Sequence, residues 1–188
     1  MPAVSFGYKA TWLAVRDGSA GVVADALELP ERRTVGWHDG VDAAYRGELL
    51  ITAPVDGWTF AVTAPGHALP DLSDAGFAEW FGKLSARLGT VRCFVTHRVV
   101  ELHGWARAEL GRVERVYCYL GERGEVLADI GQRTADEVGG EPDEDDVLRL
   151  AGLWSVNPAE LDGRDVPGDC LVAGRPPESR WRTGWPRR

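Results

Sequence analysis

One short stretch of the sequence concentrates residue types that perform acid–base, nucleophilic or metal chemistry. It is residues 96–103, which read THRVVELH. In a regular strand His97, Glu101 and His103 point to one face, and His97 and His103 lie about 20 Å apart, too far for one metal ion. Glu101 and His103, about 6.6 Å apart, could share a ligand. A bulge between His97 and Glu101 would change both the facing and the distance.

The next strand adds a cysteine to this cluster. If Leu110-Gly111 forms a two-residue turn, the pairing places Arg107 opposite Glu114 and His103 opposite Cys118. A histidine beside a cysteine lowers the pKa of the thiol and creates a nucleophile. The candidate catalytic residues are His97, Glu101, His103 and Cys118. The alternative is a solvated sheet face on which these side chains make ordinary polar contacts.

Four further residues are candidates for contacting a ligand or a partner. Arg98 and Trp105 belong to the same strand region, and His38 lies beside Trp37 near the start of an expected helix. The alternative for His38 is a simple turn, with Asp39 capping the helix. Motifs for nucleotide binding, zinc proteases, dithiol redox chemistry and α/β-hydrolases are missing from the sequence, so neither a cofactor nor a metal is expected, and enzymatic activity stays open.

The candidate catalytic residues lie on strands of a predicted sheet. Apolar and β-branched runs predict strands at roughly 8–16, 91–108, 112–120 and 125–130, with a bulge or bend near residues 98–100 of the long second strand. Residues 49–63 predict a hairpin, because Asp56-Gly57 suits a type I′ turn. That turn pairs Ile51 with Val62 and Ala53 with Phe60.

Helices must cover this sheet. Ser19 is expected to cap a helix that runs to about residue 29, and a second short helix is expected near residues 37–45. Residues 73–88 have the strongest helical pattern, with Ser73 as cap and Gly89 after the end. The apolar stripe of this helix is Phe77, Trp80, Phe81, Leu84 and Leu88. A further helix is expected at about 142–154 with Pro142 in its first turn, and another helical turn at Asn157-Pro158.

Length and composition fit one domain. The 188 residues are 44% hydrophobic and 27% charged, which is ordinary for a globular protein. We therefore expect a single α+β domain over residues 1–173, with an antiparallel sheet packed by two or three amphipathic helices, and a loose tail over 174–188. Neither a membrane-spanning run nor a secretion signal is visible. Three cysteines do not make a disulfide framework, which favours the cytoplasm and reduced thiols.

Charge is unevenly distributed along the chain. The net charge is −8, and residues 136–146 contain Asp and Glu with no compensating base. This acidic stretch is either a docking strip for a basic partner or a solvated first turn of a helix. An acidic body disfavours nucleic-acid binding. The basic, Trp-containing tail at 174–188 could contact an acidic surface, including that of its own domain, stack on bases or settle at a membrane interface.

Three segments carry a resemblance to other sequences: residues 91–120, Val55-Asp56-Gly57-Trp58 and residues 153–158. With them the chain resembles a set of hypothetical proteins from GC-rich bacteria, a resemblance that implies no activity and no site residues. In its small size, acidity and eight Trp, the chain is similar in general style to immunity proteins, which neutralise toxins in the producing cell. This likeness favours a cytoplasmic protein-binding domain, with charge to steer a basic partner and Trp side chains as anchors. The alternative is an enzyme or small-molecule binder with a polar site around Glu101, His103 and Cys118.

Overall fold

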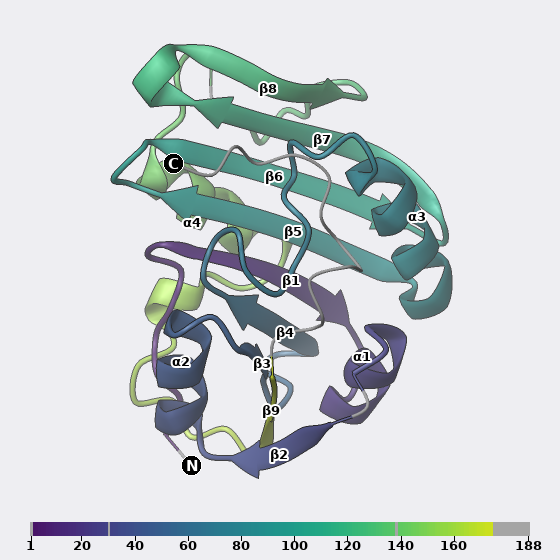
Figure 1. The fold of residues 1–188 in the computed structure, drawn as a ribbon, viewed down its shortest axis with the longest axis vertical. Coiled ribbons are helices and arrows are strands. Elements are labelled where there is room, and N and C mark those ends of the chain that lie inside the picture. The colour runs from purple at the N-terminus through teal and green to yellow at the C-terminus, as the bar shows by residue number, and fades with distance from the viewer. Residues whose placement is uncertain (1, 30, 138, 175–188) are drawn as a thin grey trace.

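The computed structural model describes residues 2–29, 31–137 and 139–174, so the predicted tail lies almost entirely outside the described residues. The strands are β1 (Ala10–Arg16), β2 (Arg32–Val35), β3 (Leu49–Ile51), β4 (Trp58–Thr63), β5 (Thr90–His97), β6 (Leu102–Glu109), β7 (Arg112–Leu120), β8 (Glu125–Ile130) and β9 (Cys170–Ala173). They form one nine-stranded antiparallel sheet in the order β2-β9-β3-β4-β1-β5-β6-β7-β8 (Figure 1). The predicted α+β class is confirmed.

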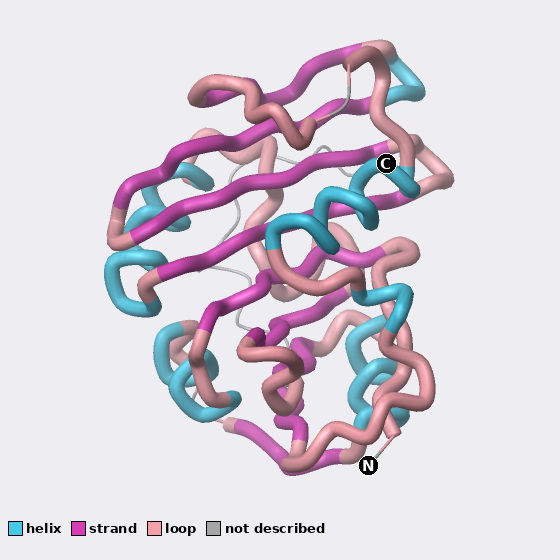
Figure 2. Tube along the Cα trace, turned by 180° about the vertical axis from the view of Figure 1, so that it is seen from behind, coloured by secondary structure: helices cyan, strands magenta, loops and turns pink. Residues whose placement is uncertain are grey.

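Helices cover both faces of the sheet. They are α1 (Ala20–Ala26), α2 (Trp37–Tyr45), α3 (Phe77–Leu88) and α4 (Glu144–Trp154), with 3₁₀ turns η1 (Gly121–Arg123) and η2 (Pro158–Glu160). One apolar core lies between the sheet and helices α1 and α3, and a second lies between the opposite face and helices α2 and α4. Figure 2 shows α4 lying across the sheet on the side opposite to α3. Neither face of the central sheet is therefore left open.

The predicted helices are present, but α1 ends at Ala26 and not near residue 29, and α3 and α4 begin later than expected. Helix α2 has the expected bounds, and the hydroxyl of Ser19 caps α1 by accepting from the Val22 N–H at 3.3 Å. Helix α3 begins at Phe77 after Gly76, not near Ser73, because the preceding residues form a separate turn in which the Asp71 N–H donates to Asp74. In its apolar stripe Phe77, Phe81 and Leu84 are buried while Trp80 and Leu88 are partly buried against the same core, and Gly89 ends the helix with φ +81°.

The start of α4 also differs from the prediction. Asp143 is the cap and the helix begins at Glu144, so Pro142 precedes the helix and does not occupy its first turn. Asp143 and Asp146 accept hydrogen bonds from each other's backbone N–H at 3.0 and 3.2 Å, a reciprocal capping box. The predicted helical turn at Asn157-Pro158 is present as η2.

The expected single strand over residues 91–108 is wrong, because the bend expected near residues 98–100 is a complete reversal of the chain. Strands β5 and β6 form a hairpin in which His97 pairs with Leu102 and Thr96 pairs with His103. The reversal over residues 98–101 contains none of the usual turn formers, and Glu101 adopts a left-handed φ of +52°. Val99 and Val100 are typical of strands, so the composition of residues 98–101 does not predict a turn.

Register differs from the prediction in both hairpins. Near the Leu110-Gly111 turn β6 and β7 pair as expected, but a bulge at Glu114 shifts the pairing, so His103 lies opposite Tyr119, and Cys118 lies opposite Gly104. Arg107 still contacts Glu114, at 3.0 Å. A one-residue shift matters because alternate side chains of a strand point to opposite faces.

The hairpin of β3 and β4 contains the predicted turn and a similar shift. Asp56 and Gly57 have φ values of +50° and +80°, as a type I′ turn requires. Ile51, however, pairs with Ala61 and not with Val62. The segment between β3 and the turn, which contains Pro54, has one residue more than the facing segment of β4; proline has no N–H with which to continue the ladder.

Candidate binding surface

The structure separates the residues predicted to be catalytic. Cys118 points into the α3-side core with Cys93, whereas the side chains of His103 and Tyr119 lie on the α4 side of the sheet. Burial raises the pKa of Cys118 to about 12, so the thiolate required of a nucleophile is disfavoured. The predicted pairing of His103 with Cys118 is therefore wrong, and the register shift in β7 is the reason.

His103 takes part in a buried contact below the start of α4. Its Nδ1 lies 3.1 Å from the hydroxyl of Thr96, and that hydroxyl donates to Glu144 at 3.3 Å. Burial lowers the pKa of His103, although the nearby carboxylates of Asp143 and Glu101 oppose this shift. The imidazole is therefore neutral near pH 7. Through Thr96 it connects β6 with Glu144 in the first turn of α4, which is a structural role.

The other predicted site residues lie around the turn between β5 and β6. The hairpin brings His97 beside the strand of His103, while Glu101 and Arg98 are exposed in the turn. In the part of the chain that the structure describes, His, Cys, Asp and Glu side chains form no group of three or more arranged to hold a metal ion. The described helices also include none long and apolar enough to cross a membrane.

Of the predicted binding residues, the two tryptophans are internal. Trp37 and Trp105 are 1% and 2% exposed and belong to the α4-side core. His38, by contrast, is exposed on α2 beside Asp42. Among the described tryptophans the bulk of the ring area fills the core, so the tryptophan excess is explained by packing.

A buried ion pair, which no local pattern predicted, holds the acidic stretch against the sheet. Arg115 on β7 donates to both carboxylate oxygens of Glu137, which lies in the loop before α4. Burial raises the pKa of Glu137, but the hydrogen bonds from Arg115 and the Thr134 N–H outweigh it, so that pKa is lowered. Arg115 is also an ion-pair partner of Asp129 on β8. The loop is therefore fastened to the sheet.

Other carboxylates of this stretch are positioned by internal contacts while remaining at the surface. Asp136 accepts from the indole N–H of Trp154 at 3.0 Å, and Glu141 hydrogen-bonds to Tyr119. Asp143 and Asp146 form the capping box. Asp136, Glu141, Asp143 and Asp145 are exposed. We call residues 136, 141 and 143–146 the acidic strip.

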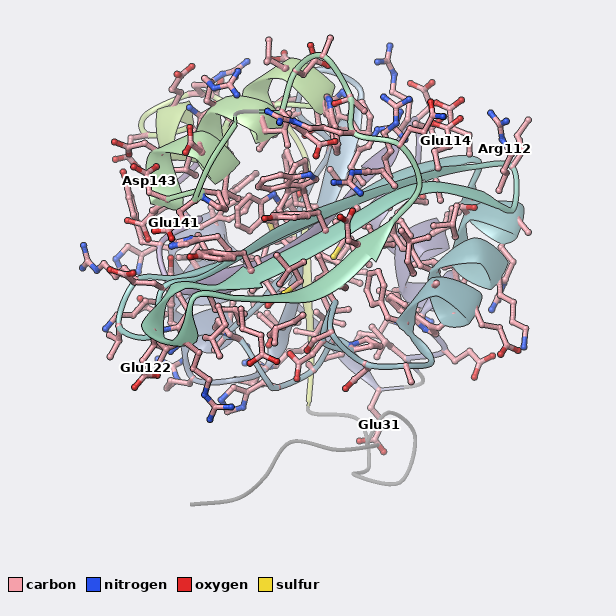
Figure 3. All side chains as sticks on the ribbon, turned by 90° about the horizontal axis from the view of Figure 1, so that it is seen from above. Glu31, Arg112, Glu114, Glu122, Glu141 and Asp143 are labelled. Carbon is pink, nitrogen blue, oxygen red and sulfur yellow. The ribbon has the colours of Figure 1, made fainter. Side chains whose placement is uncertain are left out.

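Glu141 and Asp143 of the acidic strip lie at one end of the sheet, whereas Asp136 lies beside Trp154 at the C-terminal end of α4. Figure 3 shows Glu141 and Asp143 together at the edge of the molecule, with Glu122 toward the same end and Arg112 at the opposite end. Negative side chains next to the exposed N-terminal turn of a helix are favourable for that helix, so this charge also stabilises α4. The contacts of Asp136, Glu141, Asp143 and Asp146 hold those carboxylates in place.

A groove continues this surface along the outer side of α4. Its volume is ≈ 690 Å³, and its lining includes Asp145 of the acidic strip together with the apolar side chains of Tyr8, Leu148, Leu153 and Val156. Leu153 is 57% exposed and Tyr8 43%. None of the predicted catalytic residues lines this groove. The sequence offered one sign of it, because Leu153 follows an otherwise regular buried stripe on α4.

Comparison with known proteins finds no matching family model, no similar curated protein and no similar solved structure.

Proposed function

We propose that this chain is a protein-binding domain that recognises a basic protein through the acidic strip and the outer side of α4. The observation that carries the proposal is the set of exposed carboxylates held in place by the capping box and by the loop that Arg115 and Glu137 fasten. Fixed charges lose little freedom on binding and can steer an oppositely charged partner. The net charge of −8 also favours a partner with a positive charge.

An inhibitor of the immunity type is the most specific form of this proposal. A toxin that acts on nucleic acid or another anionic substrate presents a basic surface, and an acidic inhibitor can cover it with fast association. We place this activity in the cytoplasm, because Cys93, Cys118 and Cys170 are all free and buried.

The geometry gives less support to an enzyme built around His103. Cys118 lies on the other face of the sheet, and the imidazole is packed under α4 against Thr96. An active site usually combines a concave pocket with converging reactive groups. The groove along α4 lacks those groups, so the protein-binding proposal is preferred.

The test compares two double variants of equal charge change. Glu141→Gln/Asp145→Asn removes two exposed charges of the acidic strip, while Glu31→Gln/Glu79→Gln removes two exposed charges elsewhere. With the immobilised full chain as bait, a basic protein from the producing cells is expected to bind the wild type and the second variant, and to bind the first variant weakly. Equal capture by both variants, or the absence of any basic protein, would reject the proposal.

A further inference from the structure

The groove beside α4 has an apolar floor within an acidic surface. Leu148 is 5% exposed at the base, while Leu153 and Tyr8 leave 57% and 43% of their surface open. Gly152 lines the groove between them, so that part of the helix surface has no side chain. A large apolar side chain from outside could contact Leu153 and Tyr8 together and remove both from water.

The charged lining of the groove is net negative, with the carboxylates Asp56, Asp145 and Glu160 against the cations Arg149 and Arg164. Arg164 lines the groove but is paired with Asp56 at 2.7 Å. Arg149 donates to the carbonyl oxygen of Asp136 at 2.7 Å. Asp145 and Glu160 are exposed lining carboxylates, and Asp145 joins the groove to the acidic strip.

Apolar area and negative charge thus occur along the same side of one helix. Asp145, Arg149 and Leu153 follow each other at intervals of four residues on α4, so they form one row along the helix. A partner segment lying along this row would meet a carboxylate near the N-terminal end of the helix and an apolar contact near its C-terminal end. Electrostatic and apolar complementarity together restrict what fits.

We infer that the groove binds a segment of the partner in which one large apolar side chain is flanked by lysine or arginine. This inference rests on the proposed function and adds the chemistry of the recognised element. The apolar side chain lies over Leu153 and Tyr8, and the flanking cations lie near Asp145 and Glu160. The acidic strip then attracts and orients the basic partner, and the groove selects those basic segments that contain a large apolar side chain.

The test uses two synthetic peptides that differ at one position. The first has a phenylalanine between runs of lysine and serine, and the second has serine in place of the phenylalanine. Titrated into the isotopically labelled full chain, the phenylalanine peptide is expected to bind about tenfold more tightly, the ratio that burial of one large apolar side chain supports. Its amide shift changes are expected to include Leu153, Gly152 and Tyr8.

Matched variants locate the contact. Leu153→Asp is expected to abolish the tenfold preference without unfolding the protein, because Leu153 is already exposed. Leu110→Asp is the control, since Leu110 is 84% exposed in the turn between β6 and β7 and does not line the groove. The groove inference is overturned if both peptides bind equally or if Leu153→Asp leaves the preference intact.

Failure of the proposed function would give a different result. If the acidic strip does not attract basic segments, neither peptide binds, or both bind the Glu141→Gln/Asp145→Asn variant as tightly as the wild type. If only the groove inference fails, both peptides still bind with equal, salt-sensitive affinity, and that affinity falls in the charge variant.

Discussion

Arg115 and Glu137 form a two-pronged ion pair inside the protein, with N–O distances of 3.0 and 2.9 Å and side chains that are 3% and 2% exposed. The pair joins β7 to the loop that enters α4. Because that loop contains part of the acidic strip, the positions of the exposed carboxylates depend on a contact that is itself shielded from solvent. The ion pair thus connects the interior of the fold with the proposed binding surface.

Removal of one partner of this pair should be costly. Glu137→Ala leaves Arg115 with Asp129 as its ion-pair partner, and we expect a loss of about 3 kcal/mol in the free energy of unfolding, measured with urea. Asp129→Asn is the matched comparison: the Asp129 side chain is 60% exposed, so its loss should cost less than about 1 kcal/mol. Small and equal losses would show that the buried pair does not fasten the loop.

The cysteines should be unreactive in the native protein. Burial raises the pKa of Cys118 to about 12, and it also raises the pKa of Cys93 and of Cys170. At pH 8 an aromatic disulfide reagent should therefore label none of the three thiols until denaturant is added. Rapid labelling of Cys118 in the folded protein would instead restore it as a candidate nucleophile.

Asp71 should make the protein less stable as the pH rises. Burial, followed by the charge of Asp74, raises the pKa of Asp71 to about 6. Because the folded state holds this proton more tightly than the unfolded chain, stability falls between about pH 4 and pH 6 and stays reduced above it. Asp71→Asn should remove this decline and stabilise the protein at pH 7.5 by up to about 3 kcal/mol, measured by thermal and urea unfolding. An unchanged pH profile would contradict the assignment.

His103, in contrast to Asp71, should make the protein less stable as the pH falls. Burial lowers its pKa, so the unfolded chain takes up a proton first as the pH falls. The stability that His103 provides is complete above about pH 6.5 and is lost progressively below it. His103→Gln should therefore reduce the difference in unfolding free energy between about pH 7 and about pH 5.5. A nuclear magnetic resonance titration of the imidazole in the wild type should give a midpoint below about 6.5, and a higher midpoint would refute this account.

Local patterns in the sequence predicted those parts of the fold that depend on neighbouring residues. The Ser19 cap, the helix Trp37–Tyr45, the Asp56-Gly57 turn and the apolar stripe of α3 each follow from short-range spacing. The length of the run over residues 91–108 predicted a bend near residues 98–100, but not a complete reversal, because residues 98–101 include none of the usual turn formers.

The candidate site was less predictable, for two physical reasons. The bulge at Glu114 moves Cys118 to the face opposite His103, and a single extra residue in a strand leaves no mark in composition. The contact of Arg115 with Glu137 joins residues far apart in the chain, each ordinary in its local sequence. The acidic stretch was visible from the start, but the way its carboxylates are held depends on these tertiary contacts.

The association rate with the captured partner tests the central claim most directly. Raising the ionic strength from about 0.1 M to about 1 M shortens the screening length from about 10 Å to about 3 Å, so steering by the acidic strip should weaken strongly. We predict that the association rate constant of the wild type falls at least about tenfold over this range, and that Glu141→Gln/Asp145→Asn has a slower rate at low salt with a smaller salt dependence. An association rate that is independent of salt, or equally dependent in wild type and variant, would contradict the account.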